Sequence, residues 1–75
     1  QVVNLRDLER VFVDGDTASV DEMIARGLVR RRGGPVKVLA DGELTKKLTV
    51  CAHKFSKSAQ EQIESVGGQC EVVTP

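Results

Sequence analysis

The near absence of aromatic side chains is the feature that most constrains how this chain folds. It has two phenylalanines and neither tryptophan nor tyrosine among 75 residues, although 40% of its residues are apolar. A chain this short buries only about 60% of the surface that its unfolded form exposes. We therefore expect one domain with a thin core of Val, Leu, Ile, Ala and Met. Recognition of single-stranded RNA by stacking its bases on aromatic rings is poorly supported.

The first third of the chain predicts a short strand and two short helices. The strand is Val2-Val3, and Asn4 can cap the helix that follows. The apolar residues of this helix recur at helical spacing: Leu5, Leu8 and Phe12. An Asp-Gly-Asp turn signal at 14–16 ends it, and the Ser-Val-Asp-Glu sequence at 19–22 has the spacing of a capping box for a second helix. The second helix should end near Gly27.

The middle and the end of the chain predict strands. The segments 36–40 and 48–52 are rich in β-formers, and Asp41-Gly42 could close a hairpin between them or form only a bend. The segment 70–73 predicts a last strand, so that 48–73 forms a strand, helix, strand unit. The fold class we expect is α/β: a small single domain with short strands forming a mixed sheet and about three short helices, of an irregular β-β-α type.

The third helix is predicted from apolar residues at helical spacing, which are Phe55, Ala59, Ile63 and Val66. Its N-cap is either Ser56 or Ser58, and Ser58 would also form a capping box with Glu61. The pair Gly67-Gly68 provides the left-handed residue that ends a helix.

Charge is strongly segregated along the chain, although the net charge is zero. Residues 26–57 hold nine lysines and arginines against two acids, a net charge of +7, whereas 1–25 carry −4 and 58–75 carry −3. A local excess of cations can attract nucleic acid even in a neutral protein. A solvated charged face paired with the acidic segments would give the same pattern.

Three adjacent arginines form the most concentrated basic feature. Arg30, Arg31 and Arg32 lead into Gly33-Gly34-Pro35, a sequence that favours a loop. Guanidinium groups match phosphate geometry, so each could reach a different phosphate oxygen. The alternative is a loop that only increases solubility. The residues that we expect to contact RNA are Arg26, Arg30, Arg31, Arg32, Lys37, Lys46, Lys47, Lys54, Ser56, Lys57 and Ser58.

The start of the third helix is a candidate phosphate site. A helix N-terminus offers free backbone N–H groups and a partial positive charge, and lysines at 54 and 57 flank it. Ser56 and Ser58 could donate hydroxyls to a phosphate oxygen, or could serve only as helix caps.

No catalytic or metal site is predicted. Cys51 and His53 lie two residues apart on a strand without a third group to orient them, and His53 is the only histidine. Cys51 and Cys70 are too few for a secreted disulfide scaffold, so we expect two reduced thiols in the core. The sequence lacks a run of about 18 apolar residues, and we expect no membrane contact, no cofactor and no small-molecule substrate.

Much of the chain resembles one protein family. The ungapped stretch 37–67 contains Gly-Glu-Leu-Thr-Lys-Lys-Leu-Thr-Val at 42–50 and Phe-Ser-Lys-Ser-Ala at 55–59. Upstream, Val-Asn-Leu-Arg-Asp-Leu-Glu at 3–9 and Gly-Leu-Val-Arg-Arg at 27–31 extend the likeness. These motifs resemble the C-terminal globular domain of the bacterial ribosomal protein L fifteen family and its archaeal and eukaryotic relatives.

The resemblance implies a structural role in the large ribosomal subunit rather than an enzyme. It implies contact with ribosomal RNA and with neighbouring large-subunit proteins, in a cytoplasmic or an organellar ribosome. Residues 1–75 would be the globular domain, and the chain, which begins at Gln1, would be a fragment without the family's basic N-terminal extension. Cys51 and Cys70 depart from the family, which commonly has lysine or another polar residue there. The alternative is a protein-interaction module that does not bind RNA.

Overall fold

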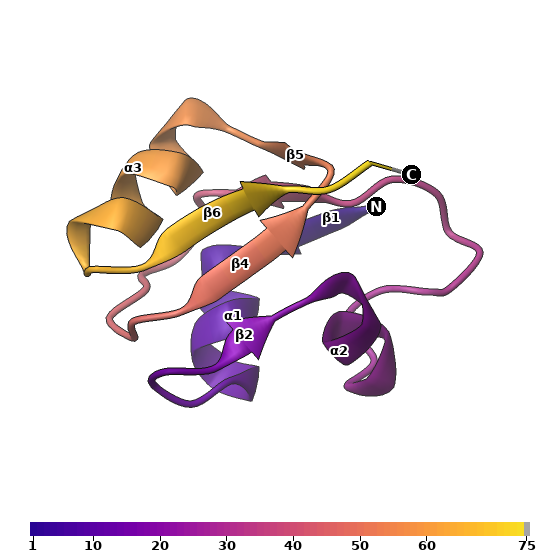
Figure 1. Ribbon diagram of the computed structural model, residues 1–75, viewed down its shortest axis with the longest axis horizontal. Helices are drawn as coiled ribbons and strands as arrows, with labels where there is room; N and C mark the ends of the chain where they lie inside the picture. Colours follow the sequence, from indigo (N-terminus) through magenta and orange to yellow (C-terminus); the bar gives the residue numbers. More distant parts are fainter. Residues whose placement is uncertain (75) are drawn as a thin grey trace.

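The computed structural model describes residues 1–74 as three helices and six strands, all of them short. In chain order they are β1 (Val2–Asn4), α1 (Leu5–Val11), β2 (Thr17–Ala18), α2 (Val20–Ala25), β3 (Lys37–Leu39), β4 (Thr49–Ala52), β5 (Lys54–Phe55), α3 (Lys57–Ser65) and β6 (Gln69–Val72). Figure 1 shows α1 and α2 on one side of the strands and α3 on the other.

Successive strands alternate between two sheets. The odd-numbered strands form one sheet in the order β1-β3-β5, and the even-numbered strands form the other in the order β2-β4-β6. All four strand pairings are parallel. The chain thus winds as a coil of three turns, and each turn adds one strand to each sheet (Figure 1). We call the β1-β3-β5 sheet the odd sheet and the β2-β4-β6 sheet the even sheet.

This winding confirms the expected α/β class and corrects two of its details. The single mixed sheet is wrong, because each strand returns to its own sheet only after a full turn and therefore runs parallel to its neighbours. The hairpin alternative at Asp41-Gly42 is also wrong, since β3 and β4 belong to different sheets. The strand, helix, strand unit expected over 48–73 is present: β4 and β6 form a parallel pair, with β5 and α3 between them in the chain.

The Asp41-Gly42 bend rests on the start of α1 instead of closing a hairpin. The backbone N–H of Arg6 donates to the carbonyl oxygen of Asp41 at 3.1 Å, and the two side chains form an ion pair at 2.9 Å. Gly42 has a φ of +92°, and a Cβ there would lie 2.4 Å from the Cβ of Arg6. A glycine is therefore required by both conformation and space.

The core is thin and aliphatic, as expected. Phe12 is its one fully buried aromatic side chain among residues 1–74. The largest other side chains in it, each less than 2% exposed, are Leu5, Leu8, Met23, Leu48, Ile63, Val3, Val36, Val38 and Val50. They come from both sheets and from all three helices, so the two sheets share one core.

The third helix begins and ends close to its expected bounds, with two corrections. Ser56 is the N-cap, and its Oγ accepts from the backbone N–H of Ala59 at 3.1 Å. Ser58 lies inside the first turn, so the expected capping box with Glu61 is not formed. Phe55 packs against the core from β5 rather than from the helix, because the strand pairing with β3 ends only there.

The Gly67-Gly68 stop is confirmed as a Schellman motif. Gly67 has a φ of +87° and donates to the carbonyl oxygen of Glu64 at 3.0 Å, while Gly68 donates to that of Ile63 at 2.9 Å. A Cβ on Gly68 would lie 2.4 Å from the carbonyl oxygen of Leu48. The end of α3 therefore packs directly on the backbone that enters β4.

Candidate nucleic-acid interface

The arginine segment forms the loop that the sequence predicts, and Gln1 holds it in place. The Gln1 side-chain Nε2 donates to the carbonyl oxygens of Arg30 at 3.0 Å and Gly34 at 3.2 Å. Its Oε1 accepts from the backbone N–H of Arg30 at 2.7 Å. A Cβ on Gly33 would collide with this amide, since it would lie 2.3 Å from the Gln1 Cδ. The backbone of the loop is thus tied to the residue before β1.

The three guanidinium groups of this loop are exposed, although Gln1 holds the loop's backbone. Arg30, Arg31 and Arg32 are all solvent-exposed, and none of their side chains has a hydrogen bond or an ion pair with residues 1–74. Three positive charges therefore project from a constrained loop at one end of the coil. Because they have no internal partner within this range, an external anion would not have to displace one.

Two lysines lie at the same end of the odd sheet. Lys37 and Lys54 are register partners in the parallel pair β3-β5, so their side chains leave the same face of the sheet. Lys54 is exposed and Lys37 is half-buried. The backbone N–H of Lys37 donates to the carbonyl oxygen of Gln1 at 2.8 Å, which places this pair beside the residue that holds the arginine loop. We call Arg30, Arg31, Arg32, Lys37 and Lys54 the basic end.

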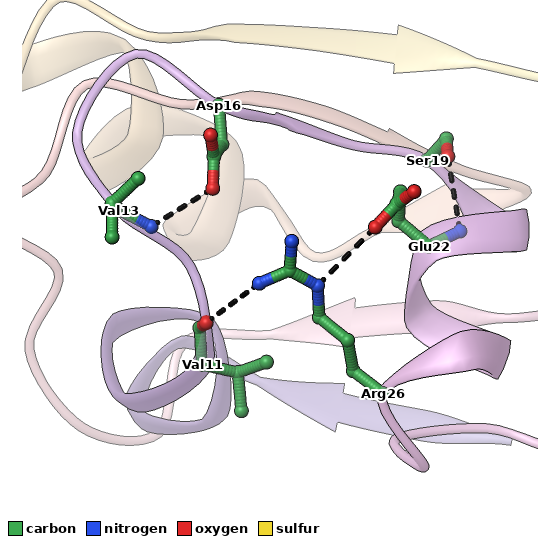
Figure 2. A network of polar contacts seen from close by, with 6 residues as sticks. All are labelled: Val11, Val13, Asp16, Ser19, Glu22 and Arg26. Carbon is green, nitrogen blue, oxygen red and sulfur yellow. Dashed lines mark hydrogen bonds and ion pairs between the residues drawn. The ribbon is translucent and has the colours of Figure 1, made fainter.

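Arg26 is engaged within the molecule (Figure 2). Its NH1 donates to the carbonyl oxygen of Val11 at 2.9 Å, and its Nε donates to the Glu22 carboxylate at 3.2 Å. The guanidinium carbon lies 4.5 Å from the centre of the Phe12 ring. Ser19 caps α2 as expected, but the Glu22 carboxylate turns to Arg26 instead of completing the capping box. Arg26 thus joins α2 to the end of α1.

Lys46 is also engaged within the molecule. Its half-buried ammonium group donates to the carbonyl oxygen of Glu9 and, at 2.7 Å, to that of Phe12. These are carbonyls at the C-terminal end of α1, where a positive charge is favourable. The neighbouring Thr45 is held by the Glu9 carboxylate, and these hydrogen bonds lower the pKa of Glu9.

The remaining predicted contacts are distributed over the surface, and all except the half-buried Ser56 are exposed. Lys47 lies beside the Gly67 turn, away from the basic end, with its side chain 3.7 Å from the place of a Gly67 Cβ. Lys57 and Ser58 are exposed in the first turn of α3, and Ser56 provides the cap. The predicted residues thus do not form one continuous surface.

The two cysteines cannot bond to each other in this fold. Cys51 pairs with Glu71 and Cys70 pairs with Val50 in the β4-β6 ladder, so the two thiols lie on opposite faces of the even sheet. Neither is in a disulfide in this structure, and Cys51 is buried and Cys70 half-buried. Burial, with a smaller contribution from Glu64, raises the pKa of Cys70 to about 11. Burial and a hydrogen bond to Glu71 raise the pKa of Cys51.

Among residues 1–74, no three side chains of the metal-ligating types are close enough to hold a metal ion. The helices in this range are too short to cross a membrane.

The sequence reasoning missed Gln1, Arg26 and Lys46 as organising residues. Each has backbone carbonyl partners between 15 and 37 positions away, and only the lysine and arginine charge was visible in the sequence. A charge count cannot separate a cation that binds its own fold from one that faces solvent.

Comparison with known proteins matches this chain to ribosomal proteins. Residues 2–71 match a family model that describes ribosomal proteins 50S-L15 and 50S-L18e together with their counterpart in the 60S subunit. The chain is 49% identical over 72 residues to the large ribosomal subunit protein uL15 of Thermosipho africanus, covering 96% of this chain and 49% of that protein. It is 53% identical over 68 residues to uL15 of Mycobacterium marinum, covering 91% and 46%.

The protein named uL15 from Corynebacterium diphtheriae is 54% identical over 68 residues, covering 91% of this chain and 45% of that protein. The chain therefore spans about half the length of the relatives it matches. The family consists of ribosomal proteins, not enzymes. On the match over residues 2–71, this chain belongs to the family of ribosomal proteins that comprises 50S-L15, 50S-L18e and their 60S counterpart.

Proposed function

We propose that this domain is a structural constituent of the large ribosomal subunit that binds ribosomal RNA through its backbone phosphates. The basic end supplies the main contact, and its RNA partner is recognised by shape rather than by base sequence. The uL15 relatives support the ribosomal setting. Neighbouring large-subunit proteins are its further partners, in the ribosome of the cytoplasm or of an organelle.

One observation carries this proposal: the three guanidinium groups of the arginine loop are exposed and have no partners within residues 1–74, while the loop backbone is tied to Gln1. A loop that served only solubility would not need this bracing. Constraining the backbone reduces the entropy lost when several arginines bind phosphates together. Lys37 and Lys54 extend the positive charge along the odd sheet.

Lys47, Lys57, Ser56 and Ser58 remain predicted contacts outside the basic end. The start of α3 would bind a phosphate through Lys57 and the exposed Ser58 hydroxyl, while Ser56 caps the helix. Arg26 and Lys46, in contrast, act through their internal partners. We propose that they support the fold from which the other cations project.

A salt titration of RNA binding tests the proposal. Each phosphate neutralised adds roughly 0.7 to 0.9 to the slope of the logarithm of affinity against the logarithm of salt concentration. Replacing Arg30, Arg31 and Arg32 together by Ala should therefore flatten the slope by roughly 2 to 3. The control is Arg6→Ala with Arg10→Ala, which removes two exposed cations on α1, outside the basic end. An unchanged slope in the triple variant would favour the protein-interaction alternative.

A further inference from the structure

A pocket of about 590 Å³ opens at the carboxyl ends of all three strands of the even sheet. Ser19 follows β2, His53 follows β4, and Val73 follows β6, and all three line it. The carboxyl edge of a parallel sheet is where ligands commonly bind in α/β proteins. The arginine loop forms another wall of the pocket, through Arg30 and Arg31.

The lining combines an apolar surface with a few polar groups. Val20, Ile24 and Val73 supply aliphatic surface. His53 Nδ1 accepts from the backbone N–H of Val36 at 2.8 Å, so the proton of the neutral imidazole is on Nε2, which is available as a donor. Asp21 supplies a carboxylate acceptor at the edge. A volume in this range with mixed chemistry is typical of a small-molecule site.

We infer that this pocket holds one unstacked nucleotide of the bound RNA, an inference that rests on the proposed function. The phosphate would meet Arg30 and Arg31, and the base would lie against the aliphatic side chains. Guanidinium planes can stack on a base in the absence of aromatic rings. Asp21 and His53 offer an acceptor and a donor to the polar edge of the base.

Charge and position favour a nucleotide over a peptide as the occupant. Two of the pocket's side chains, Arg30 and Arg31, are exposed cations of the basic end, whereas Asp21 is the one acid that lines it among residues 1–74. An RNA strand whose phosphates lie on the arginine loop would pass the mouth of the pocket. One nucleotide turned out of the strand could then enter without leaving that surface.

Nuclear magnetic resonance of the labelled 75-residue chain tests this inference with two probes, a short single-stranded RNA of mixed sequence and a blunt RNA duplex of the same length. We expect the single strand to shift the methyl signals of Ile24 and Val73 and the ring signals of His53. The duplex should shift the amide signals of the basic end but not these methyl and ring signals, because its bases remain stacked.

A charge-neutral variant separates the pocket from the basic end. Val73→Trp should fill the pocket and give an affinity for the single strand roughly tenfold lower than that of a variant with the same indole ring outside the pocket, since stacking on such a ring can itself add affinity. Its matched control is Val72→Trp, on the neighbouring residue, which is 72% exposed and does not line the pocket. Affinity for the duplex should be the same in both variants.

The possible failures are distinguishable. If both RNAs bind with the arginine-dependent salt slope while the methyl signals of Ile24 and Val73 stay unshifted in the wild-type chain, the pocket assignment is wrong and the proposed function stands. The resonance measurement on the wild-type chain needs no variant, so misfolding of Val73→Trp cannot obscure it. If neither RNA binds at low salt, both the pocket assignment and the proposed function are overturned.

Discussion

Replacing Lys46 by Met should destabilise the domain without weakening RNA binding. The Lys46 ammonium donates to two carbonyl oxygens at the end of α1, those of Glu9 and Phe12. Methionine retains most of the aliphatic stem but leaves both carbonyls without this donor. A hydrogen bond from a charged donor contributes about 1.5 to 3 kcal/mol. Because water can reach these half-buried oxygens, we expect a total loss of about 2 to 3 kcal/mol rather than the full sum.

The assay is urea denaturation followed by circular dichroism, with Lys47→Met as the control. Lys47 is an adjacent, exposed lysine, and its replacement should change the free energy of unfolding by less than about 0.5 kcal/mol. For a domain of this size, the Lys46→Met loss corresponds to a fall in Tm of roughly 10 to 20 °C. Equal stability of the two variants would refute the assigned role of Lys46. A flatter salt slope in folded Lys46→Met would also refute it, since the ammonium would then be contacting RNA.

Three other predictions follow from the fold. Ser56→Ala should lower the free energy of unfolding by about 1 kcal/mol, measured by thermal unfolding, because it removes the cap of α3. Ser58→Ala should leave stability nearly unchanged and lower only RNA affinity. Equal losses of stability in the two variants would contradict the cap assignment. Cys51 and Cys70 should both titrate as free thiols after denaturation without reductant. In the native state both should alkylate more slowly than free cysteine at pH 8, because their pKa values are raised. Because hydrogen bonds lower the pKa of Glu9, its ionised carboxylate stabilises the folded state at pH values above the ordinary carboxyl pKa. This stabilisation is lost as the pH falls through the pKa of Glu9 in the folded state. Glu9→Gln should therefore lose stability less steeply than wild type on acidification. An identical acid profile for both chains would remove Glu9 from the explanation.

The elements that could be predicted from the sequence are those fixed by neighbouring residues. The turn at 14–16, the Ser19 cap and the Gly67-Gly68 stop each depend on residues within one helical turn, and each is present. Phe55 was misplaced because a residue just before a helix can extend the helix's apolar stripe while belonging to a strand.

Strand pairing and the candidate site required the three-dimensional structure. Each strand pairs with one that lies a full turn of the coil away, and no local pattern encodes that partner. The charge pattern correctly singled out the arginine loop as an exposed cation cluster, but it could not reveal that Gln1 braces the loop or that Arg26 has internal partners.

The alternation of strands between the sheets has a consequence for how the chain reaches its native state. Neither sheet receives its last strand before the final third of the chain, since β5 begins at Lys54 and β6 at Gln69. A growing polypeptide therefore cannot complete one sheet as an independent unit and add the other later. Because nearly all strand contacts close long loops, folding should be slow for a domain of this size. A nascent chain would gain its cooperative structure only once its last strand has left the site of synthesis.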